Sequence, residues 1–299
     1  MFVSHGVLIA VINSVVNAFC DPLRKYLAKF MDPFMVVAMR GLIQAPLFVL
    51  WALIESGGRV PHLNHLFWTS VGISGGINLI TSYLYIRAIQ ISTLSATVPF
   101  LSFTPAFLVI VACFVLGEVP TLFGVLGIGV ATLGGLWLQS TKDEHPSKDL
   151  LLNSSSKGSM YMMIVAFLWS ISNAFDKIGV QNATPLVYGA AIQVIVAGGS
   201  CILQKIGVGE RDVLPIGQER KIPWKVVVLT GIMSVVAYYI NLVAAQLLEV
   251  SYVIAIKRSG CIWSVLMGRV VFRERNLRKK FPSILLMVLG VVCIVVGKS

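Results

Sequence analysis

Charged residues are scarce in this chain: of its 299 residues, only 12% are Asp, Glu, Lys or Arg. A soluble domain contains about 25% charged and 45–50% apolar residues. Here the apolar share is 57%. This composition excludes a water-soluble globule, a disordered chain and a secreted disulfide scaffold. It indicates a protein of which most residues lie in a lipid bilayer.

The chain also lacks the short motifs that carry common membrane chemistry. It has no Walker A glycine loop, so ATP does not drive it, and no HExxH or GxSxG motif. Its five cysteines form no CxxC pair, and its four histidines lie at or outside the ends of apolar runs. We therefore expect no catalytic residues, no metal site and no cofactor.

Ten apolar runs can be marked, most of them 17–25 residues long, which suits one membrane crossing each. The runs cover residues 5–23, 33–54, 66–90, 93–116, 121–140, 159–181, 184–204, 223–248, 251–272 and 281–297. The first run has no basic leader and no small-residue cleavage site, so we expect it to be a retained helix. The sequence predicts an all-α membrane protein with ten transmembrane helices.

The two halves of the chain repeat each other at an offset of 156 positions. Asn17-Ala18-Phe19 falls on Asn173-Ala174-Phe175, and the offset slips by about four residues around the second helix. Further matches are Gly75 with Gly231, Tyr83 with Tyr239, Gln90 with Gln246, Glu118 with Glu274 and Gly134 with Gly290. We expect five-helix repeats over 1–140 and 159–299, with a polar linker at 141–158. Because five is odd, the halves should be inverted, with a site between them near the midplane.

Several segments of these repeats resemble the drug/metabolite transporter superfamily, EamA type. They are Ser82–Ala88, Val98–Pro105 and Leu116-Gly117-Glu118 in the first half, and Ile254–Ser259 and Phe272-Arg273-Glu274 in the second. The resemblance covers nearly the whole chain. It implies alternating access, with export or exchange of small metabolites, and it indicates no particular substrate.

Lys257 and Arg258 are candidate substrate ligands, because charges within apolar spans mark functional sites by default. Their mates at the repeat offset are Leu101 and Ser102, so the scaffold itself does not need the charges. The pair resembles one that sugar-phosphate translocators of the superfamily use to hold phosphate. The alternative is that Lys257 reaches the nearer interface or pairs with a carboxylate.

Polar side chains at matching helical spacing form a second candidate set for substrate binding. Asn78, Ser82 and Tyr85 follow i, i+4, i+7 spacing, and the mates of these residues are Ser234, Tyr238 and Asn241. Asn17 and Asn173 add one amide from each half. We expect these stripes to line a wet cavity, although hydrogen bonds between helices would explain them equally well.

Three further residues are assigned to gating or hinge motion. Arg40 is expected to form a structural or gating ion pair, and Pro99 and Pro105 to bend the fourth helix.

Asp176 and Lys177 are expected near the membrane interface. With no clearly central Asp or Glu, proton-coupled drug efflux is disfavoured.

The function predicted from the sequence is secondary active transport of a small polar or anionic metabolite by alternating access. The transporter would be an exporter or exchanger, coupled to a proton or a counter-substrate, and act as a monomer or homodimer in the plasma membrane. We expect contact with the lipid bilayer and no nucleic acid partner. The alternatives are an intramembrane enzyme and a non-transporting receptor or scaffold.

The basic residues predict an orientation. Of the 24 Lys and Arg residues, Arg59, Lys177 and Lys298 fall on the side of both termini, and Arg40, Lys257 and Arg258 within spans. The others fall on the opposite side. The positive-inside rule places that opposite side in the cytoplasm and both termini outside it.

Overall fold

The computed structural model describes residues 2–59, 61–92, 98–140, 151–206, 222–258, 260 and 277–296. These residues form helices joined by turns, with no strand among them. The elements are α1 (Phe2–Leu27), α2 (Pro33–Glu55), α3 (His65–Ile91), the 3₁₀-helix η1 (Val98–Phe103), α5 (Thr104–Leu116), α6 (Leu122–Ser140), α7 (Leu151–Gln181), α8 (Pro185–Ile206), α9 (Trp224–Leu247), α10 (Val250–Arg258) and α12 (Leu277–Val296).

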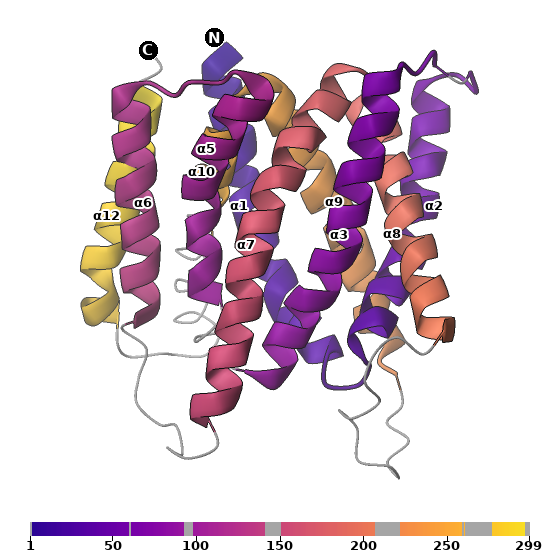
Figure 1. The fold of residues 1–299 in the computed structure, drawn as a ribbon, viewed down its shortest axis with the longest axis horizontal. Helices are drawn as coiled ribbons and strands as arrows, with labels where there is room; N and C mark the ends of the chain where they lie inside the picture. Colours follow the sequence, from indigo (N-terminus) through magenta and orange to yellow (C-terminus); the bar gives the residue numbers. More distant parts are fainter. Residues whose placement is uncertain are drawn as a thin grey trace.

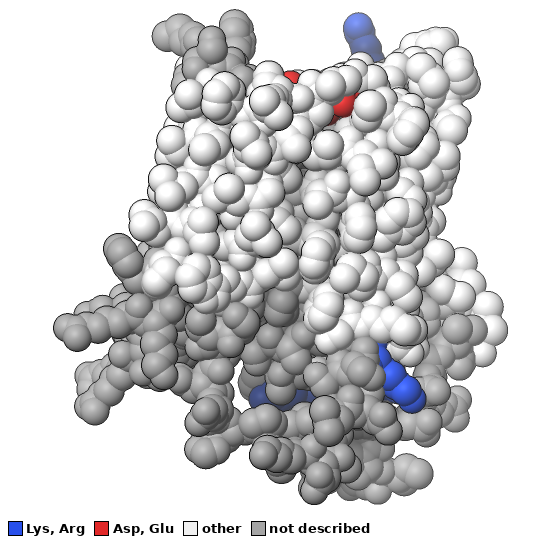
Figure 2. Space-filling model, turned by 60° about the vertical axis from the view of Figure 1, so that its left-hand side comes forward, with Lys and Arg blue, Asp and Glu red and all other residues white. Residues whose placement is uncertain are grey.

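Five of these helices, α1, α2, α7, α8 and α9, are long and apolar enough to cross a membrane. Shorter apolar helices lie in the η1–α5 segment, α6 and α12. Figure 2 shows that the coloured charges lie near the two ends of the molecule, with uncharged side chains over most of its height. Large apolar side chains such as Phe114 and Ile54 are exposed. This surface suits contact with lipid.

Local signals in the sequence set several helix ends. Asp32 caps α2 by accepting a hydrogen bond from the Met35 backbone nitrogen at 2.9 Å, and Pro33 occupies the first turn. Asn64 caps α3 in the same way. Gly117 ends α5 with a positive φ of 67°, a conformation that glycine adopts without strain.

The fourth apolar run differs from the single bent helix expected over 93–116. The chain forms η1 and then α5, with Pro99 in η1 and Pro105 in the first turn of α5. Proline lacks a backbone N–H, so it is tolerated at a helix start, where that group has no intrahelical partner. Hinge motion at these prolines stays a prediction, and residues 93–97 and 261–272 of the two matching runs lie outside the described residues.

Helix packing follows the repeat. Two repeat mates, α2 and α8, pack against each other, and so do α6 and α12. The contact of α3 with α7 has its counterpart in the contact of α1 with α9. In Figure 1, α1 and α7 run in opposite directions and both termini lie at the same end. This is the arrangement that a two-fold axis relating two inverted halves produces.

Two glutamines make the same hydrogen bond in both halves. The Gln90 side-chain nitrogen donates to the Ala28 carbonyl at 3.1 Å, and the Gln246 side-chain nitrogen to the Val180 carbonyl at 2.6 Å. Val180 is the counterpart of Ala28 once the four-residue slip is included. Each bond fastens the end of a third repeat helix to the end of a first one, so the repeat extends to side-chain contacts.

Glycine lets the backbones of α6 and α12 approach each other closely. A Cβ built on Gly290 would lie 2.5 Å from the Ala131 backbone nitrogen and 2.7 Å from the Gly127 carbonyl oxygen. Because these neighbours are backbone atoms, they have little room to shift.

We expect Gly290→Ala to lower the free energy of unfolding by about 1–3 kcal/mol, the usual cost of overpacking. Gly129→Ala in α6 is the matched control, because a Cβ there meets nothing within 4 Å. Thermal unfolding of both variants in detergent checks this prediction. Equal melting temperatures would contradict the close packing of α6 on α12.

Candidate functional site

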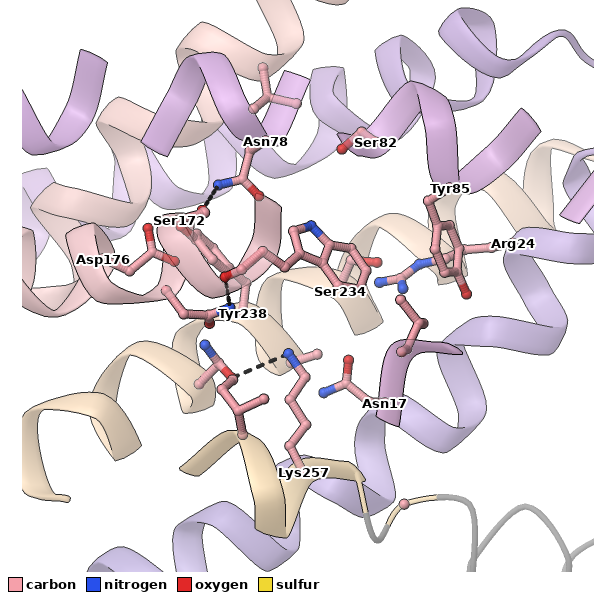
Figure 3. A pocket seen from close by; sticks show the side chains of 18 of the residues that line it. Asn17, Arg24, Asn78, Ser82, Tyr85, Ser172, Asp176, Ser234, Tyr238 and Lys257 are labelled. Atoms are coloured by element: carbon pink, nitrogen blue, oxygen red, sulfur yellow. Dashed lines mark hydrogen bonds between the residues drawn. The ribbon is translucent and has the colours of Figure 1, made fainter. Parts of the chain in front are cut away.

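A cavity of about 220 Å³ lies where the two halves meet, lined by helices from both. Its volume is below the ~300–1,000 Å³ of sites for drug-sized ligands, so it suits a small metabolite. Eleven of the candidate binding and gating residues from the sequence line it: Asn17, Arg40, Asn78, Ser82, Tyr85, Asn173, Ser234, Tyr238, Asn241, Lys257 and Arg258. Figure 3 labels seven of them, Asn17, Asn78, Ser82, Tyr85, Ser234, Tyr238 and Lys257. Pro99 and Pro105 are not among the lining residues.

Lys257 lies against a wall of amides. Its ammonium donates to the Asn241 side-chain oxygen at 3.2 Å, and the Asn13 amide donates to the same oxygen at 3.0 Å. Asn17 in turn donates to the Asn13 side-chain oxygen at 2.6 Å. These contacts join α1, α9 and α10, and they place the ammonium inside the cavity instead of at a lipid interface (Figure 3).

Arg258 lies against a different, aromatic wall. Its guanidinium carbon is 5.5 Å from the centre of the Trp169 ring, and one of its terminal nitrogens donates to the Thr104 hydroxyl at 3.2 Å. Trp169 also stacks on Tyr85, with ring centroids 5.7 Å apart. Consecutive helix residues point about 100° apart, so Lys257 and Arg258 contact different parts of the cavity.

Asp176 lines the cavity, whereas its expected place near the membrane interface stays a prediction. Its residue is only 4% exposed. The carboxylate accepts hydrogen bonds from the hydroxyls of Ser74 and Tyr188, the latter at 2.9 Å. Ser74 also contacts the Ser172 hydroxyl, to which the Asn78 amide donates at 2.8 Å. Its hydrogen-bond partners lie on α3 and α8, so these helices cover Asp176 although it lies five residues before the end of α7.

Lys177 is also buried, and it forms an ion pair with Glu118. Its ammonium donates to the Leu248 carbonyl at 2.7 Å, and Glu118 accepts from the Val250 backbone nitrogen at 3.2 Å. The four residues fasten the last turns of α7 to the α5–α6 and α9–α10 connections. They therefore join the two halves at one end of the bundle.

Arg24, in the last turn of α1, lines the cavity beside Tyr85 and was missed (Figure 3). The sequence contained a signal: Asn13, Asn17 and Arg24 follow i, i+4, i+11 spacing and share one helix face. Trp169 and Ser172 were missed as well. Trp169 lies one helical turn before Asn173, and Ser172 lies one residue before it.

The charges of the cavity wall are mostly positive. The described lining residues include the four cations Arg24, Arg40, Lys257 and Arg258 and the single carboxylate of Asp176. The wall also holds two hydroxyls, on Ser234 and Tyr238, that are buried without a hydrogen-bond partner among the described residues. A buried polar atom without a partner is disfavoured, so these hydroxyls are available to a solute.

We expect Lys177→Met to lower the free energy of unfolding by about 3–5 kcal/mol, because it leaves the Glu118 carboxylate buried without its cation. Adding Glu118→Gln should recover part of this loss. Lys205→Met, which removes an exposed lysine from the end of α8, should change little. Thermal unfolding of these three variants and of Glu118→Gln alone measures these effects, and simple addition of the losses of the two single variants, Lys177→Met and Glu118→Gln, would refute the coupling.

Comparisons with known proteins agree with this architecture. The model of the EamA-like transporter family matches residues 4–139 and again 156–296. A protein of known crystal structure superposes with a TM-score of 0.76 at 18% sequence identity, over 97% of both chains. At this identity the likeness concerns the fold alone. A search of curated proteins finds no match.

Proposed function

This chain belongs to the EamA-like transporter family of the drug/metabolite transporter superfamily, and we propose that it moves a small anionic metabolite across a membrane. The family and the apolar helices make it a multi-pass integral membrane protein. Because this is a family of transporters, membership favours transport over the enzyme and receptor alternatives. The cavity between the halves is the proposed binding site.

The observation that carries the anionic assignment is the excess of cations on the cavity wall. Lys and Arg side chains within a membrane are disfavoured by about 2.5–3.5 kcal/mol on insertion scales, and they mark ion and substrate pathways. Lys257 and Arg258 replace the Leu101 and Ser102 of the first half, and all four residues line the cavity. An anion bound there would offset the charge that the second half introduces.

Hydrogen bonding supports a polar solute. The hydroxyls of Ser234 and Tyr238, together with the amides of Asn17, Asn78 and Asn241, give the cavity both donors and acceptors. A small hydroxylated anion could use its charge at Lys257 and its hydroxyls at these groups. A purely apolar drug would leave the same groups without partners.

We propose alternating access as the mechanism, with ten membrane crossings arranged as two inverted five-helix units. The two-fold packing of the helices supports this, because exchanging the conformations of inverted halves opens the cavity to opposite sides. Transport would be export or exchange at the plasma membrane. The ion pair of Lys177 with Glu118 would hold one end closed in the conformation described here.

Replacing Lys257 tests the site. We expect Lys257→Leu to lower anion uptake on the order of 10- to 100-fold, because a hydrogen bond to a charged group contributes about 1.5–3 kcal/mol. Lys257→Arg should retain part of the uptake. The measurement is uptake into proteoliposomes, screened over phosphorylated, carboxylated and neutral metabolites.

The matched control is Lys225→Leu, which removes an exposed lysine from the first turn of α9, outside the cavity. All variants should elute and melt like the wild type, so that a loss of uptake does not reflect unfolding. Normal anion uptake by Lys257→Leu would remove this lysine from the site. Uptake of neutral solutes alone by the wild type would contradict the anionic assignment.

The charge distribution also predicts how the chain sits in the membrane. Both termini lie at one end of the bundle (Figure 1), and most basic residues were assigned to the other end. We expect a C-terminal reporter that is active only in the cytoplasm to be silent, and one in the 141–158 linker to be active. The reverse pattern would overturn this orientation.

A further inference from the structure

We propose that Asp176 binds a proton that is transported together with the anion, so that the protein is a proton–anion symporter. This inference rests on the proposed transport function and adds its coupling ion. Asp176 is the single carboxylate among the described lining residues, and it is buried. A proton on its carboxylate oxygen would raise the charge of the cavity by one unit and would occupy almost none of the cavity volume.

The groups around Asp176 can form hydrogen bonds with both the ionised and the protonated carboxyl group. Its present partners, Ser74 and Tyr188, are hydroxyls. Both donate to the carboxylate here, but a hydroxyl also accepts hydrogen bonds when it rotates. Ser74 can then accept from a protonated Asp176 without a change of backbone. An arginine or a backbone N–H in that place could only donate and would keep the carboxylate ionised.

Charged and titratable groups face Asp176 from several helices. Lys257 of α10 and Tyr238 of α9 interact with it electrostatically, and Tyr188 of α8 donates to it. On α7 itself the next residue, Lys177, is held by Glu118 and the Leu248 carbonyl. The cation that acts on Asp176 from across the cavity is therefore Lys257, the proposed ligand of the anion.

This arrangement couples the proton to the anion. While Asp176 is ionised, its charge attracts Lys257 and competes with the anion for that ammonium. Protonation removes the competing charge, so the anion binds more tightly. By linkage, the bound anion strengthens proton binding by the same factor. A shared preference of this kind makes the two ligands travel in one direction. A proton and a monovalent anion together carry no net charge, so the loaded cavity keeps the charge of the empty one.

The test uses the full-length protein in proteoliposomes, with gluconate, succinate and sulfate as probes at several pH values. We expect the wild type to accumulate at least one probe when the side of entry is made acidic. Its affinity for that probe should be roughly 5- to 150-fold higher in the protonated state, the usual range of coupling between two sites. A pH-sensitive dye trapped in the vesicles should record protons entering with the probe.

Asp176→Asn replaces the carboxylate with a neutral amide of the same shape. We expect it to lose both the pH dependence of probe affinity and the proton entry, so that its exchange of probe for probe is the same at every pH. Asp32→Asn is the control, because Asp32 caps α2 outside the cavity and asparagine caps as well as aspartate. Infrared difference spectra add a second readout: a carboxyl band that appears when the wild type is acidified should be absent from the spectrum of Asp176→Asn.

Three results would overturn the proposal. The first is that the wild type transports a probe without any effect of the pH gradient. The second is that Asp176→Asn keeps the full pH dependence, and the third is that Asp176→Asn binds the probe weakly at every pH. The last result would give Asp176 a structural role, in which it holds the hydroxyls of Ser74 and Tyr188 in place, instead of a proton-binding one. If the wild type transports none of the probes, the anion transport function itself fails, which the dye and uptake assays distinguish.

Discussion

The constraint on which this structure depends is that polar groups inside a membrane bundle must find their partners within the protein. The bundle meets it with amide side chains that reach backbone carbonyls, as Gln90 and Gln246 do at equivalent places in the two halves. Several buried side-chain atoms have no hydrogen-bond partner in the described part of the chain, and among their hydroxyls those of Ser234 and Tyr238 line the cavity. Hydroxyls without partners there are what a binding site needs before its solute arrives, and such atoms elsewhere would only weaken the bundle.

The two halves share a scaffold but differ where they face the cavity. The stacked pair of Trp169 and Tyr85 occupies the positions that Asn13 and Asn241 occupy at the repeat offset, where a hydrogen bond replaces the ring contact. In the aromatic pair, the Trp169 ring contacts the guanidinium of Arg258. In the amide pair, the Asn241 side-chain oxygen accepts a hydrogen bond from Lys257. Symmetry therefore provides two equivalent walls, which would exchange conformations under the proposed alternating access. The differences between those walls give the cavity a polarity that can orient a solute.

The helices and much of the cavity wall could be predicted from the sequence, because both depend on periodicity. Stripes at i, i+4, i+7 share a helix face whatever the tertiary structure, and all three polar members of the α3 stripe line the cavity. The burial of a residue by neighbouring helices could not be predicted in the same way. Asp176 lies five residues before the end of α7, yet neighbouring helices cover it. The position of a residue along one helix does not show which other helices surround it.

Charge links the cavity to the transport cycle. In an occluded state the wall would enclose four cations with one carboxylate, and enclosing uncompensated charge is disfavoured by several kcal/mol per ion. A divalent anion bound near Lys257 would lower that penalty even when Asp176 takes up a proton, whereas an empty cavity retains it. Under the proposed mechanism, the change between inward and outward conformations is then easier for the loaded protein than for the empty one. Such a difference would make the return of the empty carrier the slow step of net symport, and Lys257 and Arg258, the residues of the second half that break the repeat, contribute to it.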